Sequence, residues 1–225
     1  MRISTRLGAA ALAIALMGGI GLTGAPAQAK TTTSVSGKAS LAFLPSTLSA
    51  LSLSGVQFGY TPPATSVGDG AASQTLVFPT ATPVKAGVVT LEGGMSVGAS
   101  IARLYLAAPR LEGTTGTSGR MTFEITDMPA DGPAELTNGS RIGVFTVSSL
   151  KSQTRKGRVT KVGETWARTD RQRITGQVSL ADDTALMASI NSYIGTSFFT
   201  PGLAFGTLTT VITTKLTCST RAACG

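Results

Sequence analysis

The sequence offers few side chains that could catalyse a reaction, and its lack of histidine is the most informative feature. Among 225 residues there is no His, so Ser-His-Asp and Cys-His nucleophilic sites cannot be built. Residues 148–151 match the Ser-x-x-Lys pattern of penicillin-recognising enzymes, but they end a β-patterned run, whereas that chemistry needs the Ser at a helix start. We therefore predict a non-catalytic protein.

Nucleotide and metal sites are disfavoured for similar reasons. The glycine-rich stretch from Gly113 to Arg120 lacks the Gly-Lys-Ser/Thr ending of a phosphate-binding loop and precedes a predicted strand instead of a helix. It is typical of a hairpin loop. Two cysteines without histidine cannot complete a tetrahedral metal shell, and no calcium-loop spacing of acids occurs.

Basic side chains are concentrated between residues 151 and 173, where only Glu164 and Asp170 oppose them. Alternation with apolar residues would place many of them on one face of a sheet, where they could meet an anionic partner. Candidate partners are wall polymers, lipid head groups or the propionates of a porphyrin. The alternative is a solvated edge hairpin, because charges also protect exposed strands. The candidate binding residues here are Arg155, Lys156, Arg158 and Lys161, and the rest of the stretch adds Lys151, Arg168, Arg171 and Arg173.

The three tyrosines are the candidate haem ligands, because a phenolate is the remaining option without histidine. Tyr193 belongs to the apolar face of a predicted helix and is expected in the core. Tyr60 ends a predicted strand beside a Pro-Pro loop, an accessible setting, and Tyr105 lies in another strand. Tyr60 and Tyr105 are therefore the ligand candidates if haem is a cofactor.

The first 29 residues have the pattern of a signal peptide. Arg2 and Arg6 precede an apolar run, and Ala27-Gln28-Ala29 is a typical cleavage site. We predict cleavage after Ala29, a secreted or cell-surface location, no later transmembrane segment, and no nucleic-acid partner. Without Arg2 and Arg6 the formal charge falls from +8 to +6, and residues 30–225 suit one domain.

Both cysteines lie near the C-terminus, as Cys218 and Cys224. An oxidising exported setting predicts that they close a small loop. Such a short loop contributes about 2 kcal/mol at most, so it would pin the tail without holding the fold together.

Short alternating runs separated by turn residues dominate the chain after residue 30. Met121 to Ile125 is one of the clearest, with polar and apolar side chains in period two. Two short helices interrupt the pattern: Ser46 could cap one, and Asp182 or Asp183 could cap another that ends at Gly195. We predict a mainly β fold, an antiparallel β-sandwich or barrel of about ten strands with two short helices.

One short stretch occurs twice. Ser36 to Ala42 returns in similar form as Thr175 to Ala181, and each copy predicts a strand that leads into a helix. The two copies should therefore bracket the domain. In the basic third of the chain, Arg158 to Trp166 and Arg173 to Leu180 are predicted as further strands.

Residues 104–125 resemble the haem-transport-associated (HtaA-type) domains of actinobacterial surface proteins. Those domains tend to have Leu-x-Leu-x-x-Pro-Arg-Ile, a glycine-rich turn and an alternating strand. Here Leu104 to Leu111, Gly113, Gly116 and the strand from Met121 follow that order. Phe78-Pro79 and the paired glycines at 93 and 94 are similar too, so the resemblance extends loosely over residues 36–125.

This resemblance implies a β-rich surface domain that binds haem. The family's opening motif, Trp-Gly-x-Lys-x-Ser-aromatic, is represented by Lys38 and Ser40, but Trp is absent, and Phe43 and Leu44 follow where a ligand Tyr would stand. The family's ligand is therefore not carried over. We expect an exported binding domain for haem or another apolar anionic ligand, or alternatively an envelope-associated structural module that binds acidic polymers through a basic hairpin.

Overall fold

Twelve strands and three short helices make up the part of the chain that the computed structural model describes, residues 31–70, 72–82, 84–99, 101–129 and 132–225. The predicted signal peptide and its cleavage site lie outside the described residues. No helix within the described ranges is long and apolar enough to span a membrane. The elements are β1 (Thr31–Phe43), α1 (Pro45–Leu53), β2 (Gln57–Thr61), β3 (Thr65–Val67), β4 (Thr75–Pro79), β5 (Val89–Thr90), β6 (Gly94–Gly98), β7 (Arg103–Glu112), β8 (Gly119–Thr126), β9 (Arg141–Arg155), β10 (Thr160–Val162), β11 (Thr165–Leu180), α2 (Thr184–Ile194), β12 (Ala204–Cys218) and α3 (Arg221–Cys224).

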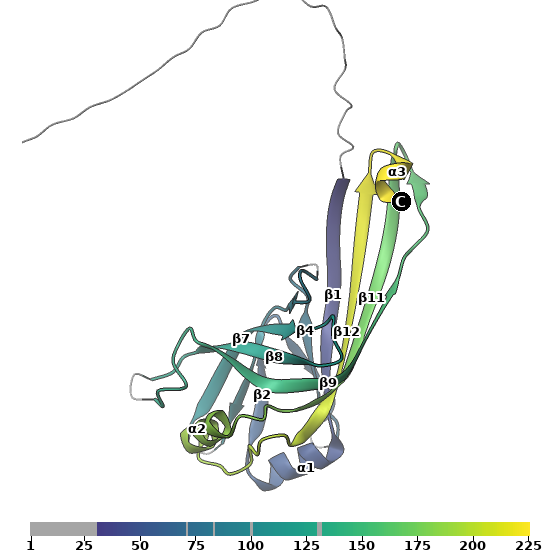
Figure 1. Ribbon diagram of the computed structural model, residues 1–225. Helices are drawn as coiled ribbons and strands as arrows, with labels where there is room; N and C mark the ends of the chain where they lie inside the picture. The colour runs from purple at the N-terminus through teal and green to yellow at the C-terminus, as the bar shows by residue number, and fades with distance from the viewer. Residues whose placement is uncertain (1–30, 71, 83, 100, 130–131) are drawn as a thin grey trace, which may run out of the picture.

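The strands form one antiparallel sheet that curls into a nearly closed barrel (Figure 1). Its path is β2-β6-β7-β8-β9-β11-β12-β1-β4-β3, with β10 beside β11 and β5 beside β7. The predicted mainly β, antiparallel fold with about ten strands is confirmed, because ten strands lie on the main path.

Four of these strands are much longer than the others and extend beyond the barrel. β1, β9, β11 and β12 have 13, 15, 16 and 15 residues, whereas a strand of about 5–6 residues is usual. Their outer parts rise from the barrel as a separate projection (Figure 1). We call residues 31–40, 151–175 and 209–225 the arm, and the rest of the described chain the body.

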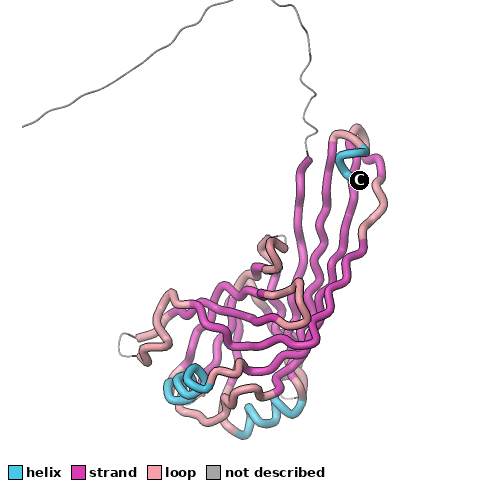
Figure 2. The backbone as a smooth tube through the Cα atoms, in the orientation of Figure 1, coloured by secondary structure: helices cyan, strands magenta, loops and turns pink. Residues whose placement is uncertain are grey.

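Aromatic rings from distant parts of the sequence fill the body. The ring centroid of Phe205 lies 4.8 Å from those of both Phe43 and Phe145, and 5.4 Å from that of Phe58. Phe205 is fully buried. Helices α1 and α2 lie at the end of the body that points away from the arm (Figure 2), so the core is closed at that end.

Both predicted helices form, and α3 in the tail is a third. The prediction that Ser46 caps α1 is wrong: the cap position is Leu44, without a side-chain bond, and Pro45 begins the helix. Proline is favoured there because the first helical N–H has no partner within the helix. Of the two acids proposed for α2, Asp183 is the cap, and its Oδ1 accepts a hydrogen bond from the Leu186 amide at 3.0 Å.

The repeated stretches lie in β1 and β11, which flank β12 on its two sides. Each strand leads into a helix, as the repeat predicts. The predicted strand from Arg158 to Trp166 is wrong, because the chain turns at Gly163 between β10 and β11. Gly163 has φ 61°, a backbone conformation that glycine adopts at little cost. The strand predicted from Arg173 therefore begins much earlier, at Thr165.

Candidate functional site

The long strands of the arm bring basic side chains from four elements onto one face. Residues opposite each other in an antiparallel ladder share a face, as do alternate residues along a strand. Arg171 of β11 lies opposite Arg155 of β9. Lys38 of β1 and Arg173 of β11 both lie opposite Val211 of β12. The same registers place Lys151 and Lys215 on this face. We call it the cationic face, and its six basic residues are Lys38, Lys151, Arg155, Arg171, Arg173 and Lys215.

Nothing in the described part of the chain neutralises these charges. All six side chains are exposed, and none forms a side-chain hydrogen bond or an ion pair with another described residue. The four long strands contain one acidic residue, Asp170. It alternates with Arg171 along β11 and therefore points to the opposite face.

The arrangement carries an electrostatic cost. Arg155 and Arg171 are directly opposite, and Arg173 follows two residues later on the same face. Like charges that face each other across an antiparallel pair destabilise the sheet. An anion bound between them would remove this repulsion, so the cationic face is suited to a negatively charged ligand.

Hydroxyl groups and a shallow groove surround the basic side chains. Ser36, Thr169 and Thr213 share this face, and their side chains can donate to anionic oxygens. A groove of about 240 Å³ runs past Lys151 at the base of the arm. It lies where the β9–β11 register shifts near Ser149, a residue with φ 53°.

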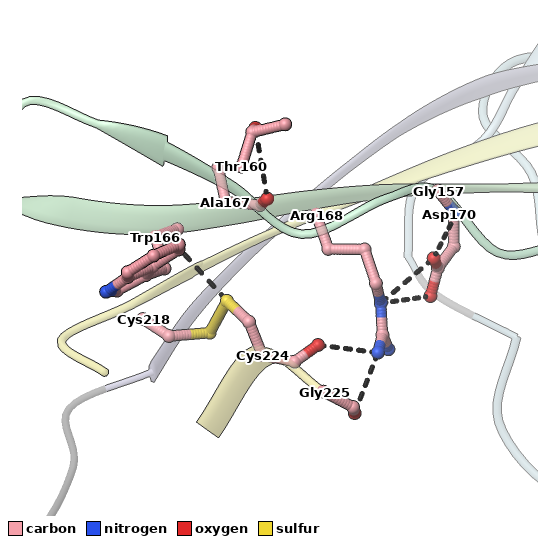
Figure 3. A network of polar contacts seen from close by, with 9 residues as sticks. All are labelled: Gly157, Thr160, Trp166, Ala167, Arg168, Asp170, Cys218, Cys224 and Gly225. Atoms are coloured by element: carbon pink, nitrogen blue, oxygen red, sulfur yellow. Dashed lines mark hydrogen bonds and ion pairs between the residues drawn. A yellow bond between two sulfur atoms is a disulfide. The ribbon is translucent and has the colours of Figure 1, made fainter. Parts of the chain in front are cut away.

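The opposite face of the arm is occupied by the C-terminal tail (Figure 3). Cys218 and Cys224 form the predicted disulfide. Arg168 forms an ion pair with Asp170 at 3.0 Å and donates hydrogen bonds to the carbonyl oxygens of Cys224 and Gly225. The Arg168 side chain thus holds the tail against β11, and it is not available to a ligand.

The structure separates the four basic residues that the sequence grouped as binding candidates. Arg155 lies on the cationic face, whereas Lys161 lies opposite Trp166 on the face that carries the tail. Arg158 lines a groove with Arg221 of α3, and Lys156 lies in the connection between β9 and β10. β9 and β10 both pair antiparallel with β11 and therefore run in the same direction. Residues 156–159 between them have no partner in the ladder, and the register changes by one residue across them, so strand alternation does not continue through this segment.

Two members of the cationic face lie far from the basic stretch in the sequence. Lys38 and Lys215 belong to β1 and β12, which border each other in the sheet. In both strands the lysine alternates with apolar neighbours, Ala39 and Leu216, and this pattern predicts an outward-facing cation. It does not predict that the two strands meet β11 and β9.

The structure does not bring the two candidate tyrosines together. Tyr105 lies opposite Ser96, and Tyr60 lies opposite the preceding residue, Met95, so the two phenols belong to opposite faces of the sheet. Tyr193, expected in the core, packs partly buried against it. Haem binding stays a prediction that rests on the resemblance.

The body has its own charged cluster, but most of its charge is neutralised internally. Arg120 forms an ion pair with Glu112 at 2.7 Å, and Arg141 lies 3.7 Å from Glu124. Partial burial would raise the pKa of the Glu112 carboxyl. Stronger effects lower this pKa, so that it lies below its ordinary value. They are the hydrogen bond and charge of Arg120, a hydrogen bond from Thr122 and the charge of Arg141. With the nearby exposed Arg110, three arginines face two glutamates, so this cluster keeps one uncompensated cation against the six of the cationic face.

No group of three or more metal-ligating His, Cys, Asp or Glu side chains gathers in the described ranges. No protein-family model matches the sequence, and a search of curated proteins finds no match. The candidate site therefore stands on its own geometry.

Proposed function

We propose that this protein is an exported, non-catalytic module that binds acidic polymers of the cell envelope through the cationic face. The observation that carries the proposal is the set of six exposed cations that the registers of β1, β9, β11 and β12 place on one face, without acidic partners among the described residues.

The shape of the site favours an extended ligand. Small molecules usually bind in concave, mostly apolar pockets, whereas these cations lie on the open surface of a four-stranded arm (Figure 1). Their spacing follows the sheet, about 4.8 Å across strands and about 7 Å between alternate residues along a strand. A polymer with repeated phosphate or carboxylate groups could contact several cations at once.

Export is supported by two independent features. The first 29 residues have the signal-peptide pattern, and the Cys218–Cys224 disulfide closes a short loop in the C-terminal tail. Disulfides persist mainly in oxidising compartments outside the cytosol. In such a location, acidic wall polymers are abundant partners for a cationic surface.

The test is a binding assay with two probes, inorganic polyphosphate and poly-L-glutamate. We expect both to bind, with affinity falling on the order of tenfold or more between about 50 and about 200 mM salt, because bound counterions are released. The variant with Arg155→Ser, Arg171→Ser and Arg173→Ser should bind roughly 100-fold more weakly, because each lost cation removes about 1 kcal/mol of binding free energy.

A matched control removes the same net charge from elsewhere. Lys85→Ser, Arg158→Ser and Lys161→Ser together change three exposed cations outside the cationic face, and binding should weaken by less than about threefold. Equal losses in the two triple variants would show that net charge, and not the cationic face, attracts the polymer. Absence of binding by the wild-type protein would refute the proposed function.

A further inference from the structure

The outer edge of β1 is unpaired along the arm. β4 pairs with β1 from Lys38 to Ala42, and one further bond joins the Thr80 amide to the Gly37 carbonyl. Beyond that point, residues 31–36 have β12 on one side and no described strand on the other. Figure 1 shows β1 as the outermost strand at this side of the arm.

The backbone groups on this free edge belong to alternate residues. The Phe43 amide and the Gly37 carbonyl both point toward β4, and the β1–β12 register continues without a shift. In a regular antiparallel ladder the N–H and C=O groups of every second residue point to the same side. Thr31, Thr33 and Val35 therefore direct their N–H and C=O groups outward, where no described residue meets them.

This edge also lacks the features that normally block pairing. Natural edge strands carry charges, proline or bulges, but Thr31 to Ser36 has none of these. The opposite edge of the arm, in β9, does carry Lys151 and Arg155. The edge of β2 is followed by Pro62 and Pro63. The free edge of β1 is thus open to another strand.

We propose that this edge pairs antiparallel with the same edge of a second copy of the chain. The three outward residues are symmetric about Thr33, so a two-fold axis there pairs Thr33 with Thr33 and Thr31 with Val35. Each such pair exchanges two hydrogen bonds, which satisfies every outward group of both edges. The intervening pair is Thr32 with Ser34. No like charges face each other, and Thr–Thr and Thr–Val contacts are favourable across strands.

The dimer would extend the cationic face. A two-fold axis perpendicular to the sheet keeps the same faces of both arms on one side, so the two cationic faces would form one continuous surface. Mutual repulsion between the copies would weaken the dimer at low salt, and added salt would screen it. Its salt dependence is therefore opposite to that of polymer binding, and the two proposals can fail independently.

The first test is sedimentation equilibrium of the mature chain at high salt without polymer. We expect a concentration-dependent dimer in the wild-type protein. Thr33→Pro removes the outward N–H, which the monomer does not use, and should abolish the dimer. Thr33→Val keeps the backbone donor and a similar shape and should dimerise like the wild type. Circular dichroism checks that both variants fold. A wild-type protein that stays monomeric at all concentrations, or a folded Thr33→Pro variant that dimerises normally, would overturn the proposal.

The second test fixes the register and does not depend on proline. Under oxidising conditions Thr33→Cys should form a covalent dimer, because directly paired residues have Cα atoms about 5.5 Å apart, within disulfide range. Thr31→Cys is the matched control, since two copies of residue 31 would be about 13 Å apart along the strands. The native cysteines are already paired. Equal cross-linking of the two variants would contradict the proposed register.

Discussion

At the scale of single residues, the arm contains two arginines that oppose each other without an acid between them. Arg155 and Arg171 face each other across β9 and β11, whereas Arg168, three residues earlier in β11, is paired with Asp170 and the tail. Two chemically identical side chains thus have different roles because strand alternation sends them to opposite faces. One holds the structure together, and the other is free to meet a ligand.

The cap of α2 provides a residue-level test of the fold. Asp183→Ala removes the side-chain acceptor of the Leu186 amide and should lower the free energy of unfolding by about 1 kcal/mol. Asp182→Ala, at the neighbouring exposed position, should change it by less than about 0.5 kcal/mol. Urea denaturation measures both. If the two variants are equally destabilised, the cap is not the source of the effect.

At the scale of elements, the tail and the cationic face are attached to opposite sides of the same strands. The disulfide fixes α3 to the end of β12, and Arg221 lies 5.6 Å from the Trp166 ring centroid. These contacts cover the face opposite the cationic face, near the tip of the arm. They leave the cationic face uncovered, so the stability of the tail and polymer binding are separable.

Removal of the disulfide tests this separation. Cys218→Ser together with Cys224→Ser should lower the free energy of unfolding by about 2 kcal/mol, the loop-closure entropy of a short loop. Polyphosphate affinity should change by less than about twofold, because no cysteine lies on the cationic face. A large loss of affinity in a variant that remains folded would show that the tail shapes the binding surface.

At the scale of the whole molecule, the body supplies the core and the arm supplies the surface. The apolar side of the long strands continues into the barrel, where Leu41, Val178 and Leu208 are buried. Farther out, the same strands have no barrel around them and become an exposed ribbon (Figure 1). The body therefore provides the burial that stabilises strands which would otherwise be too exposed to form.

Phe205 tests this dependence of the arm on the body. Phe205→Ala should cost about 3–5 kcal/mol because the ring is fully buried among three others. Leu53→Ala, whose side chain is 90% exposed, is the matched apolar truncation and should cost less than about 0.5 kcal/mol. Hydrogen exchange should report loss of protection in the arm together with the body. Protection lost in the body alone would show that the arm is an independent folding unit.

The sequence by itself determined the features that depend on neighbours along the chain. Period-two alternation indicated the strands, Asp182 or Asp183 stood in position to cap α2, and Cys218 and Cys224 were close enough to pair. Each of these follows from local geometry. Where a local signal was weak, the prediction failed. The strand predicted across Gly163 is a hairpin of β10 and β11, and the helix predicted to be capped by Ser46 begins at Pro45.

Only the tertiary structure decided which strands are neighbours and in what register. Alternation shows that Lys38 and Lys215 point away from the apolar side of their own strands, but it does not show which other cations lie beside them. That depends on β12 being placed between β1 and β11, a long-range pairing that forms when the barrel closes around its core. The cationic face and the open edge of β1 both arise from this closure, because strand order sets which side chains adjoin and which backbone groups stay unpaired.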